Sequence, residues 1–183
     1  MYTAPNYVLG EAVDGIWKQD LLKFLGTTFK LKTFIETGTC DGGTLGGIFQ
    51  SFEDIHTIEL SDHYYGISCN RFKDIKHIHL YKGNSAEVLE QILGKLPNVP
   101  TLFWLDAHPS GGLTANGGDP LPAEISTVMK LRPDALMVID DQSDDKLSNV
   151  VAAGVNLSGW TKEFRTGVVF LHKGGYTIPP FTN

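Results

Sequence analysis

Short runs of apolar and β-branched residues alternate along this chain with segments whose apolar residues recur at helical spacing. The runs that predict parallel strands are TFIETG (33–38), HTIEL (56–60), HIHLYKG (77–83), TLFWLDA (101–107) and ALMVIDD (135–141). Strands that alternate with helices in this way are typical of a parallel sheet with helices on both faces. The pattern therefore predicts an α/β fold.

The segments between these runs predict the helices. Apolar residues at helical spacing follow the first strand at Leu45, Ile48, Phe49 and Phe52, and follow the third at Val88, Leu89, Ile92, Leu93 and Leu96. Asp119 and Pro120 predict the start of another helix, as an N-cap acid and a proline at the first helical position. The stretch from Ile16 to Leu25 predicts an extra covering helix.

The end of the chain departs from this alternation. WTKEFRTG (160–167) and VVFLHKGG (168–175) are adjacent strand-like runs, separated only by Thr166 and Gly167. Two strands joined by so short a turn predict an antiparallel hairpin.

Composition narrows the class of protein. The 183 residues fit a single domain spanning 1–183, and the net charge of -6 disfavours nucleic acid or an anionic membrane as partner. The sequence shows neither an apolar run of about 18 residues nor the features of a signal peptide. Cys40 and Cys69 form no CxxC pair, which suits a reducing compartment. We therefore expect a cytoplasmic protein.

The first predicted strand runs into a glycine-rich turn, ETGTCDGGTLGG (36–47), whose backbone N–H groups could hold an anion or the polar edge of a ligand. The G-x-G-x-x-G pattern of dinucleotide sites fails here, and Glu36 and Asp41 would repel a pyrophosphate. A phosphate-free ligand that carries an ammonium and a sulfonium fits this acidic turn better. The alternative is that the glycines only close a tight turn.

Polar residues follow the next two predicted strands. Glu59 lies 21 residues after Gly38, at the strand end where a carboxylate can accept hydrogen bonds from both ribose hydroxyls of a nucleoside. Asn84 and Ser85 follow the third strand. They would contact an adenine edge or, equally, cap the next helix.

These motifs together resemble those of class I S-adenosylmethionine-dependent methyltransferases. ETGTCDGGT (36–44) resembles the E-x-G-x-x-x-G-x-S/T turn of the catechol-type O-methyltransferases, and the similarity continues through TIELS (57–61), GNSAEVL (83–89), FWLDAH (103–108) and VIDD (138–141). WLDAHPSGGLTANGGDPLPAEI (104–125) resembles small bacterial methyltransferases with a W-L-D-x-H-x-S-G-G-x-T-A-x-G segment.

The resemblance implies a Rossmann-like sheet of seven strands with a C-terminal antiparallel hairpin, and S-adenosylmethionine as cofactor. It places Glu36 and Gly38 at the methionine moiety, Thr44 at its carboxylate, Glu59 at the ribose, Leu60 and Ser85 at the adenine, and Asp106 at the sulfonium. Thr39 and Gly42 of the turn, and Asn84, complete the expected cofactor-binding set.

A second expected site lies beside the first, because Asp106 and the Asp140–Asp141 pair end neighbouring predicted strands. Three converging carboxylates would repel one another unless a hard cation such as Mg²⁺ joins them. Catechol-type and macrocin-type O-methyltransferases use acids at matching positions to hold a divalent metal. In the alternative, Asp140 and Asp141 cap a helix and Asp106 serves only the cofactor amine.

The expected reaction is metal-assisted O-methylation of a hydroxylated small molecule or sugar, with His108 as the general base. Pro109 stands where the catechol-type pattern has a lysine base, so a catechol acceptor is in doubt. Residues 109–122 would form a lid, and a homodimer could supply further walls. The remaining histidines, predicted to be structural, are His56, His63, His77, His79 and His172.

The sequence leaves three alternative functions open. The first is a metal-independent methyltransferase with His108 or Asp106 as base. The second is a non-catalytic module that binds the adenosyl group. The third is a nicotinamide-dependent oxidoreductase.

Overall fold

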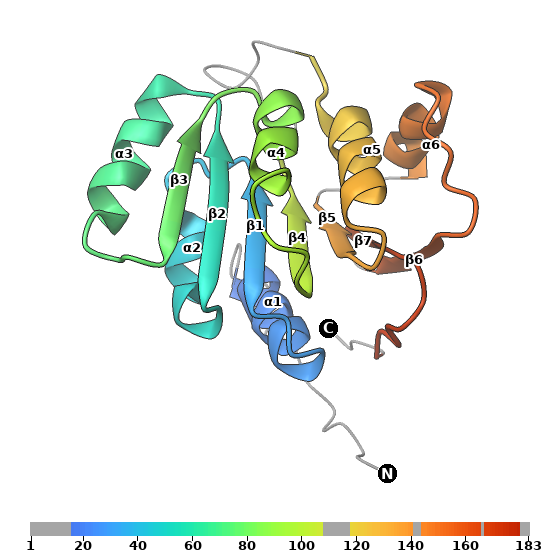
Figure 1. The fold of residues 1–183 in the computed structure, drawn as a ribbon, viewed down its shortest axis with the longest axis horizontal. Coiled ribbons are helices and arrows are strands. Elements are labelled where there is room, and N and C mark those ends of the chain that lie inside the picture. The colour runs from blue at the N-terminus through green and yellow to red at the C-terminus, as the bar shows by residue number, and fades with distance from the viewer. Residues whose placement is uncertain (1–15, 108–117, 141–143, 166, 180–183) are drawn as a thin grey trace.

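The computed structural model describes residues 16–107, 118–140, 144–165 and 167–179. Strands and helices alternate through this part of the chain, as predicted (Figure 1). The strands are β1 (Thr33–Thr37), β2 (Asp54–Glu59), β3 (Ile78–Lys82), β4 (Thr101–Leu105), β5 (Leu136–Ile139), β6 (Thr161–Arg165) and β7 (Val168–His172). The helices are α1 (Ile16–Thr28), α2 (Gly43–Ile48), α3 (Asp62–Phe72), α4 (Ser85–Leu93), α5 (Leu121–Leu131) and α6 (Asp144–Ala152), with a 3₁₀ turn, η1 (Phe49–Ser51), after α2.

The strands form one seven-stranded sheet in the order β3-β2-β1-β4-β5-β7-β6. The first five strands are parallel, and β7 runs antiparallel between β5 and β6. The predicted Rossmann-like sheet is therefore confirmed. From β1 the chain builds outward first through β2 and β3, and then on the other side through β4 and β5. The connections after β1 and β4 diverge at this reversal, and in open α/β sheets ligands bind outside the carboxyl ends of the strands at such a point.

Helices cover both faces of the sheet, so each face has its own apolar core (Figure 1). Helices α4, α5 and α6 pack on one face through residues such as Leu89 and Ile125, and α1, α2 and α3 pack on the other through Leu25 and Leu45. Phe34 and Ile35 are neighbours on β1 and both are buried, yet they belong to opposite cores. Burial on both faces explains why the strand sequences are nearly continuous apolar runs.

The predicted N-terminal covering helix is confirmed as α1, which buries Leu21, Leu22 and Leu25. The helix predicted after the first strand is shorter than its apolar spacing indicates. It ends at Ile48, and Phe52 is already extended, with φ -126° and ψ 148°. Within the described residues, none of the helices has the length and apolarity that a bilayer span needs.

The start of α5 differs by one residue from its prediction. Pro120 occupies the N-cap position and the helix begins at Leu121. Asp119 still caps it, because its Oδ1 accepts a hydrogen bond of 3.0 Å from the backbone N–H of Leu121. This cap fixes the end of the segment that follows β4.

The predicted C-terminal hairpin is confirmed by the pairing of β6 with β7, in which Arg165 lies opposite Val168. Gly167 in the connecting turn has φ 74°, a left-handed conformation that glycine adopts at low cost. Through β7 the hairpin completes the sheet beyond β5.

Candidate functional site

The turn after β1 needs left-handed backbone at alternating positions: Gly38 (φ 84°), Cys40 (φ 50°) and Gly42 (φ 78°). A Cβ on Gly38 would lie 2.6 Å from the backbone oxygen of Asp106, so the turn passes directly against the end of β4. A Cβ on Gly42 would overlap the ring of Phe72 on α3. Both glycines therefore let the turn pack closely against its neighbours.

Most backbone N–H groups of this turn donate hydrogen bonds within the chain. The pairs are Gly38 N and Thr39 N to Ile58 O, Cys40 N to Glu59 Oε2, Gly42 N to Thr39 O, and Gly43 N to Asp41 Oδ1. The sequence predicts that these N–H groups could hold an anion, but in the structure most of them already donate to acceptors within the chain. This arrangement disfavours a pyrophosphate and therefore a dinucleotide.

Glu59 is held rigidly at the end of β2. Its side chain is buried, with its Oε2 accepting from the N–H of Cys40 and its Oε1 from the N–H of Ser61, both at 2.7 Å. Each carboxylate oxygen keeps a further lone pair for another donor. A fixed carboxylate of this kind can accept a pair of hydroxyl groups without losing side-chain freedom on binding.

Glu36 is 1% exposed and lies beneath the turn. Thr57 Oγ1 donates to its Oε2 over 2.6 Å, and Thr39 Oγ1 lies 2.5 Å from Thr57 Oγ1. With Glu36 ionised, Thr57 uses its only proton on the carboxylate, so Thr39 donates to Thr57. Burial raises the pKa of Glu36 well above its ordinary value, and the charges of Asp106 and Glu59 add to the rise.

Cys40 carries its thiol among these acids. Partial burial raises the pKa of the thiol, and the nearby Asp41, Glu59 and Asp106 charges raise it further, against a lowering hydrogen bond from the Asp41 backbone. A raised pKa leaves the thiol protonated near neutral pH, which is unsuited to a nucleophile.

The residues predicted to border an adenine differ in their environment. Leu60, directly after Glu59, has 39% of its surface exposed, which is unusual for a leucine beside a buried strand. Ser85 is buried at the start of α4. Asn84 caps that helix, accepting from the N–H of Ala86 over 3.0 Å, so its carbonyl takes the capping role that the sequence left open. Thr44 is the second residue of α2 and half-buried.

Asp106 and Asp140 end adjacent strands, because Leu105 pairs with Ile139 in the β4–β5 register. The Asp140 side chain is 3% exposed and its Oδ2 lies 2.5 Å from Nζ of Lys18 on α1. A lysine of the chain thus supplies positive charge at this acid. Asp141 and His108, the other predicted metal ligand and the predicted base, lie outside the described residues, as does most of the predicted lid.

The structure adds an acid that the sequence analysis missed. Glu124 is 1% exposed on α5, and neither carboxylate oxygen has a hydrogen-bond partner among the described residues. Burial raises its pKa to about 7, and the charges of Asp119 and Asp106 add to the rise. The sequence did contain a signal for Glu124. Its spacing from Leu121 and Val128 places a charged residue on the apolar face of the predicted helix.

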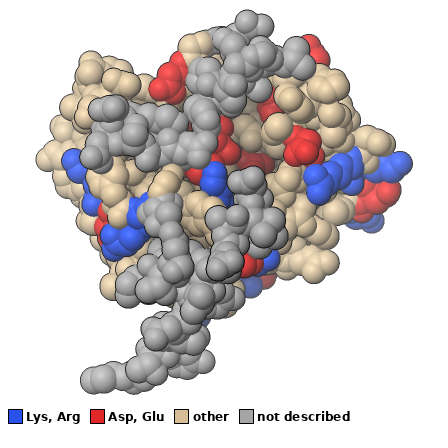
Figure 2. Space-filling view, turned by 180° about the vertical axis from the view of Figure 1, so that it is seen from behind, with Lys and Arg blue, Asp and Glu red and all other residues tan. Residues whose placement is uncertain are grey.

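These groups gather where the parallel strands end. On the face seen in Figure 2, acidic and basic side chains lie beside one another near the middle of the molecule, whereas Glu36, Glu59 and Glu124 themselves are buried beneath the surface. The structure brings Glu36, Glu59 and Asp106 close enough for their charges to interact, and Asp106 also interacts with Glu124. Such a concentration of acids favours a cationic ligand or a metal ion.

Neither a protein-family model nor a curated protein sequence matches this chain. Several solved structures, in contrast, match it in fold. The chain resembles the methyltransferase PaMTH1 of Podospora anserina, solved with S-adenosylhomocysteine (SAH), at 14% identity over 87% of this chain and 79% of that one, with a TM-score of 0.66. The O-methyltransferase TomG of Streptomyces achromogenes, solved with S-adenosylmethionine, aligns at 18% identity over 89% and 82%, with a TM-score of 0.64.

An rRNA methylase from Streptococcus thermophilus also aligns, at 14% identity over 89% of this chain and 99% of that one, with a TM-score of 0.55. Likenesses at this level of identity, together with the strand order, establish that the chain has the fold of class I S-adenosylmethionine-dependent methyltransferases. The expected fold is thereby confirmed. Because proteins with different acceptors share this fold, it does not define the acceptor.

Replacing Gly38 and Gly167 by alanine tests the close approach at β4. Both residues have similar positive φ values, but only Gly38 faces a backbone atom where its Cβ would be. We expect Gly167→Ala to lower the free energy of unfolding by about 1 kcal/mol from backbone strain, and Gly38→Ala to lower it by about 2 kcal/mol more because of overpacking. Urea denaturation measures both, and equal losses would contradict the packing argument.

Replacing Glu124 by glutamine tests its burial as a titratable group. In the folded protein Glu124 keeps its proton up to about pH 7, whereas in the unfolded chain it has its ordinary pKa of 4.5, so the free energy of unfolding falls as pH rises across that window. We expect Glu124→Gln to be more stable than the parent by on the order of 2 kcal/mol at pH 8 and equally stable at pH 4.5.

The measurement is urea unfolding at both pH values in buffer with a chelator. The exposed Glu87 on α4 provides the control, since Glu87→Gln should change stability by less than about 0.5 kcal/mol at either pH. A stability difference between parent and Glu124→Gln that did not vary with pH would contradict the assignment.

Proposed function

We propose that this protein is an S-adenosylmethionine-dependent methyltransferase that methylates a hydroxyl group of a small molecule or sugar. The observation that carries the proposal is the burial of two carboxylates, Glu36 and Glu59, beside the tight turn at the point where the strand order reverses. This arrangement fits a nucleoside with positive charge and no phosphate.

The residues at this edge fit the parts of such a ligand. When bound, S-adenosylmethionine supplies an electrophilic methyl group on a cationic sulfonium. Glu59 accepts from the ribose hydroxyls with the lone pairs left by Cys40 and Ser61. Leu60 offers its exposed apolar surface to the adenine. Glu36, Asp106 and Glu124 supply the negative potential that favours the ammonium and sulfonium groups over a neutral ligand.

The acceptor would lie beyond Asp106. Methyl transfer to oxygen requires that the hydroxyl lose its proton, and His108, two residues after Asp106, is the proposed base. Asp106, Asp140 and Asp141 provide oxygen donors that suit a divalent cation such as Mg²⁺, which would lower the pKa of a coordinated hydroxyl.

A metal-independent methyltransferase is the second candidate, favoured by the ion pair between Lys18 and Asp140. An ammonium group at this position offsets the negative charge that a metal would otherwise compensate. In this form of the reaction, His108 or Asp106 alone removes the proton of the acceptor.

Calorimetric titration with SAH tests the cofactor proposal. Saturable binding of one equivalent supports it, and absence of binding refutes it. Release of SAH from S-adenosylmethionine, measured over a panel of catechols, sugars and other hydroxylated compounds with and without a chelator, then separates the metal-assisted from the metal-independent form.

Substitution of Glu59 by glutamine tests the ribose contact. Loss of the charged acceptor should weaken SAH binding by about 1.5 to 3 kcal/mol, measured as the dissociation constant. Glu53→Gln is the control, because Glu53 is exposed just before β2, at the other edge of the sheet, and should leave binding unchanged. Equal affinity of Glu59→Gln and the parent would contradict the assignment.

Substitution of Lys18 by methionine tests whether this lysine competes with a metal for Asp140. Removal of the ammonium takes one positive charge away from Asp140, so we expect Mn²⁺ affinity to rise about tenfold or more, measured by electron paramagnetic resonance of free Mn²⁺. Asp140→Asn should abolish this gain when combined with Lys18→Met. Unchanged Mn²⁺ affinity in Lys18→Met would favour the metal-independent candidate.

A further inference from the structure

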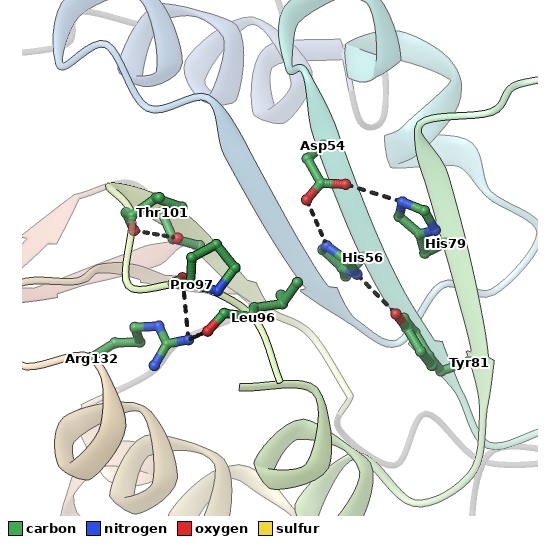
Figure 3. Close-up of polar contacts among 9 residues, drawn as sticks. Asp54, His56, His79, Tyr81, Leu96, Pro97, Thr101 and Arg132 are labelled. Carbon is green, nitrogen blue, oxygen red and sulfur yellow. Dashed lines mark hydrogen bonds and ion pairs between the residues drawn. The ribbon is translucent and has the colours of Figure 1, made fainter. Parts of the chain in front are cut away.

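A second group of polar side chains lies at the opposite edge of the sheet, where β2 begins. Asp54 directs its two carboxylate oxygens at two imidazoles, with Oδ2 3.0 Å from Nε2 of His56 and Oδ1 3.1 Å from Nε2 of His79 (Figure 3). His56 and His79 are partners in the β2–β3 register, and their rings stack with centroids 4.8 Å apart. The strand pairing therefore holds both imidazoles beside one carboxylate.

The spacing of these atoms suits a metal ion. One ligand atom from each of the three residues lies within 4.8 Å of the others. In a tetrahedral site with metal–ligand bonds of about 2.0 Å, neighbouring ligand atoms are about 3.3 Å apart. The two contacts to Asp54, one to each carboxylate oxygen, are close to that value, so rotation of the side chains can bring one oxygen and both nitrogens to coordinating positions.

His56 has the environment of an oriented ligand. It is 3% exposed, and its Nδ1 lies 3.0 Å from the hydroxyl of Tyr81. A metal ion binds the neutral imidazole through one of its two ring nitrogens. If Nε2 binds a metal, its proton moves to Nδ1 and is donated to Tyr81 Oη. Such a hydrogen bond behind a ligand fixes the ring and its tautomer.

The group is accessible from solvent on its other side. The side chains of Asp54 and His79 are 39% and 45% exposed. Asp54 also lines a cavity of about 380 Å³, with Leu96, Pro97, Thr101 and Arg132 among its other lining residues (Figure 3). The exposed surfaces of Asp54 and His79 leave room for a water molecule or another small ligand at a fourth coordination position.

We propose that Asp54, His56 and His79 form a binding site for a divalent transition metal, with Zn²⁺ as the ion that fits best. Two imidazole nitrogens and one carboxylate oxygen form a set of three protein ligands, which Zn²⁺ takes when one position is left open. The site has one negative charge before the ion binds. Lys32, which shares the cavity wall, is itself paired with Glu53 over 2.7 Å.

This site is independent of the proposed methyl transfer. The strand β2 carries Asp54 at its first residue and Glu59 at its last, so the two sites lie at opposite ends of one strand. Its ligands also differ in kind from those at Asp106 and Asp140, since nitrogen donors favour Zn²⁺ and oxygen donors favour Mg²⁺.

The test is calorimetric titration of the tag-free protein with ZnCl₂ in millimolar Mg²⁺, which occupies a site made only of oxygen ligands. We expect one equivalent of Zn²⁺ to bind, and Co²⁺ in its place to give the intense visible absorption of four-coordinate cobalt. Asp54→Asn and His79→Ala should each weaken Zn²⁺ binding at least about tenfold, because even groups behind a ligand contribute that much.

Both variants change half-exposed side chains, and thermal melts verify that they fold. His63→Ala, an exposed histidine on α3, is the matched control and should retain the affinity of the parent. Absence of saturable Zn²⁺ binding would overturn the proposal. Equal affinity of the parent, Asp54→Asn and His79→Ala, or six-coordinate Co²⁺ only, would also overturn it.

Discussion

The contact between Gly38 and the backbone of Asp106 is the constraint on which the site depends. At this point the β1 turn lies so close to the end of β4 that a side chain has no room. The contact forms where the strand order reverses, and there the parallel strands direct the residues that follow them to one edge. The position of Glu59 follows from it, because the same turn donates the N–H of Cys40 to that carboxylate.

The second constraint is electrostatic. Glu36, Glu59 and Glu124 are all buried at or near this edge, and burial of a carboxylate disfavours its charged form. Two backbone N–H groups donate to Glu59, whereas at Glu36 the hydroxyl of Thr57 relieves only part of this cost. A cationic ligand would relieve more of it, which is why the acids favour a sulfonium-bearing nucleoside over a dinucleotide.

The sequence was sufficient for the architecture because the fold depends on local patterns. Strands, helices, the hairpin at Gly167 and the acids at strand ends all follow from neighbouring residues. Contacts between segments that are distant in sequence could not be predicted from local patterns. Lys18 meets Asp140 across 122 positions of sequence, and His56 and His79 come together only through strand pairing. These two histidines were therefore predicted to be structural, and the capping role of Asn84 became clear only from its hydrogen bond with the N–H of Ala86.

The length of β2 has a consequence for how the two ends of the molecule communicate. Asp54 and Glu59 are five positions apart, so their Cα atoms lie roughly 17 Å from each other along the extended strand. At an effective dielectric constant of about 20, two unit charges this far apart interact by only about 1 kcal/mol, and mobile ions at the half-exposed Asp54 reduce this further. Electrostatic coupling between the two ends is therefore weak, and a change of charge or occupancy at one leaves the other nearly undisturbed. Natural variation can thus modify each end separately on the same rigid strand.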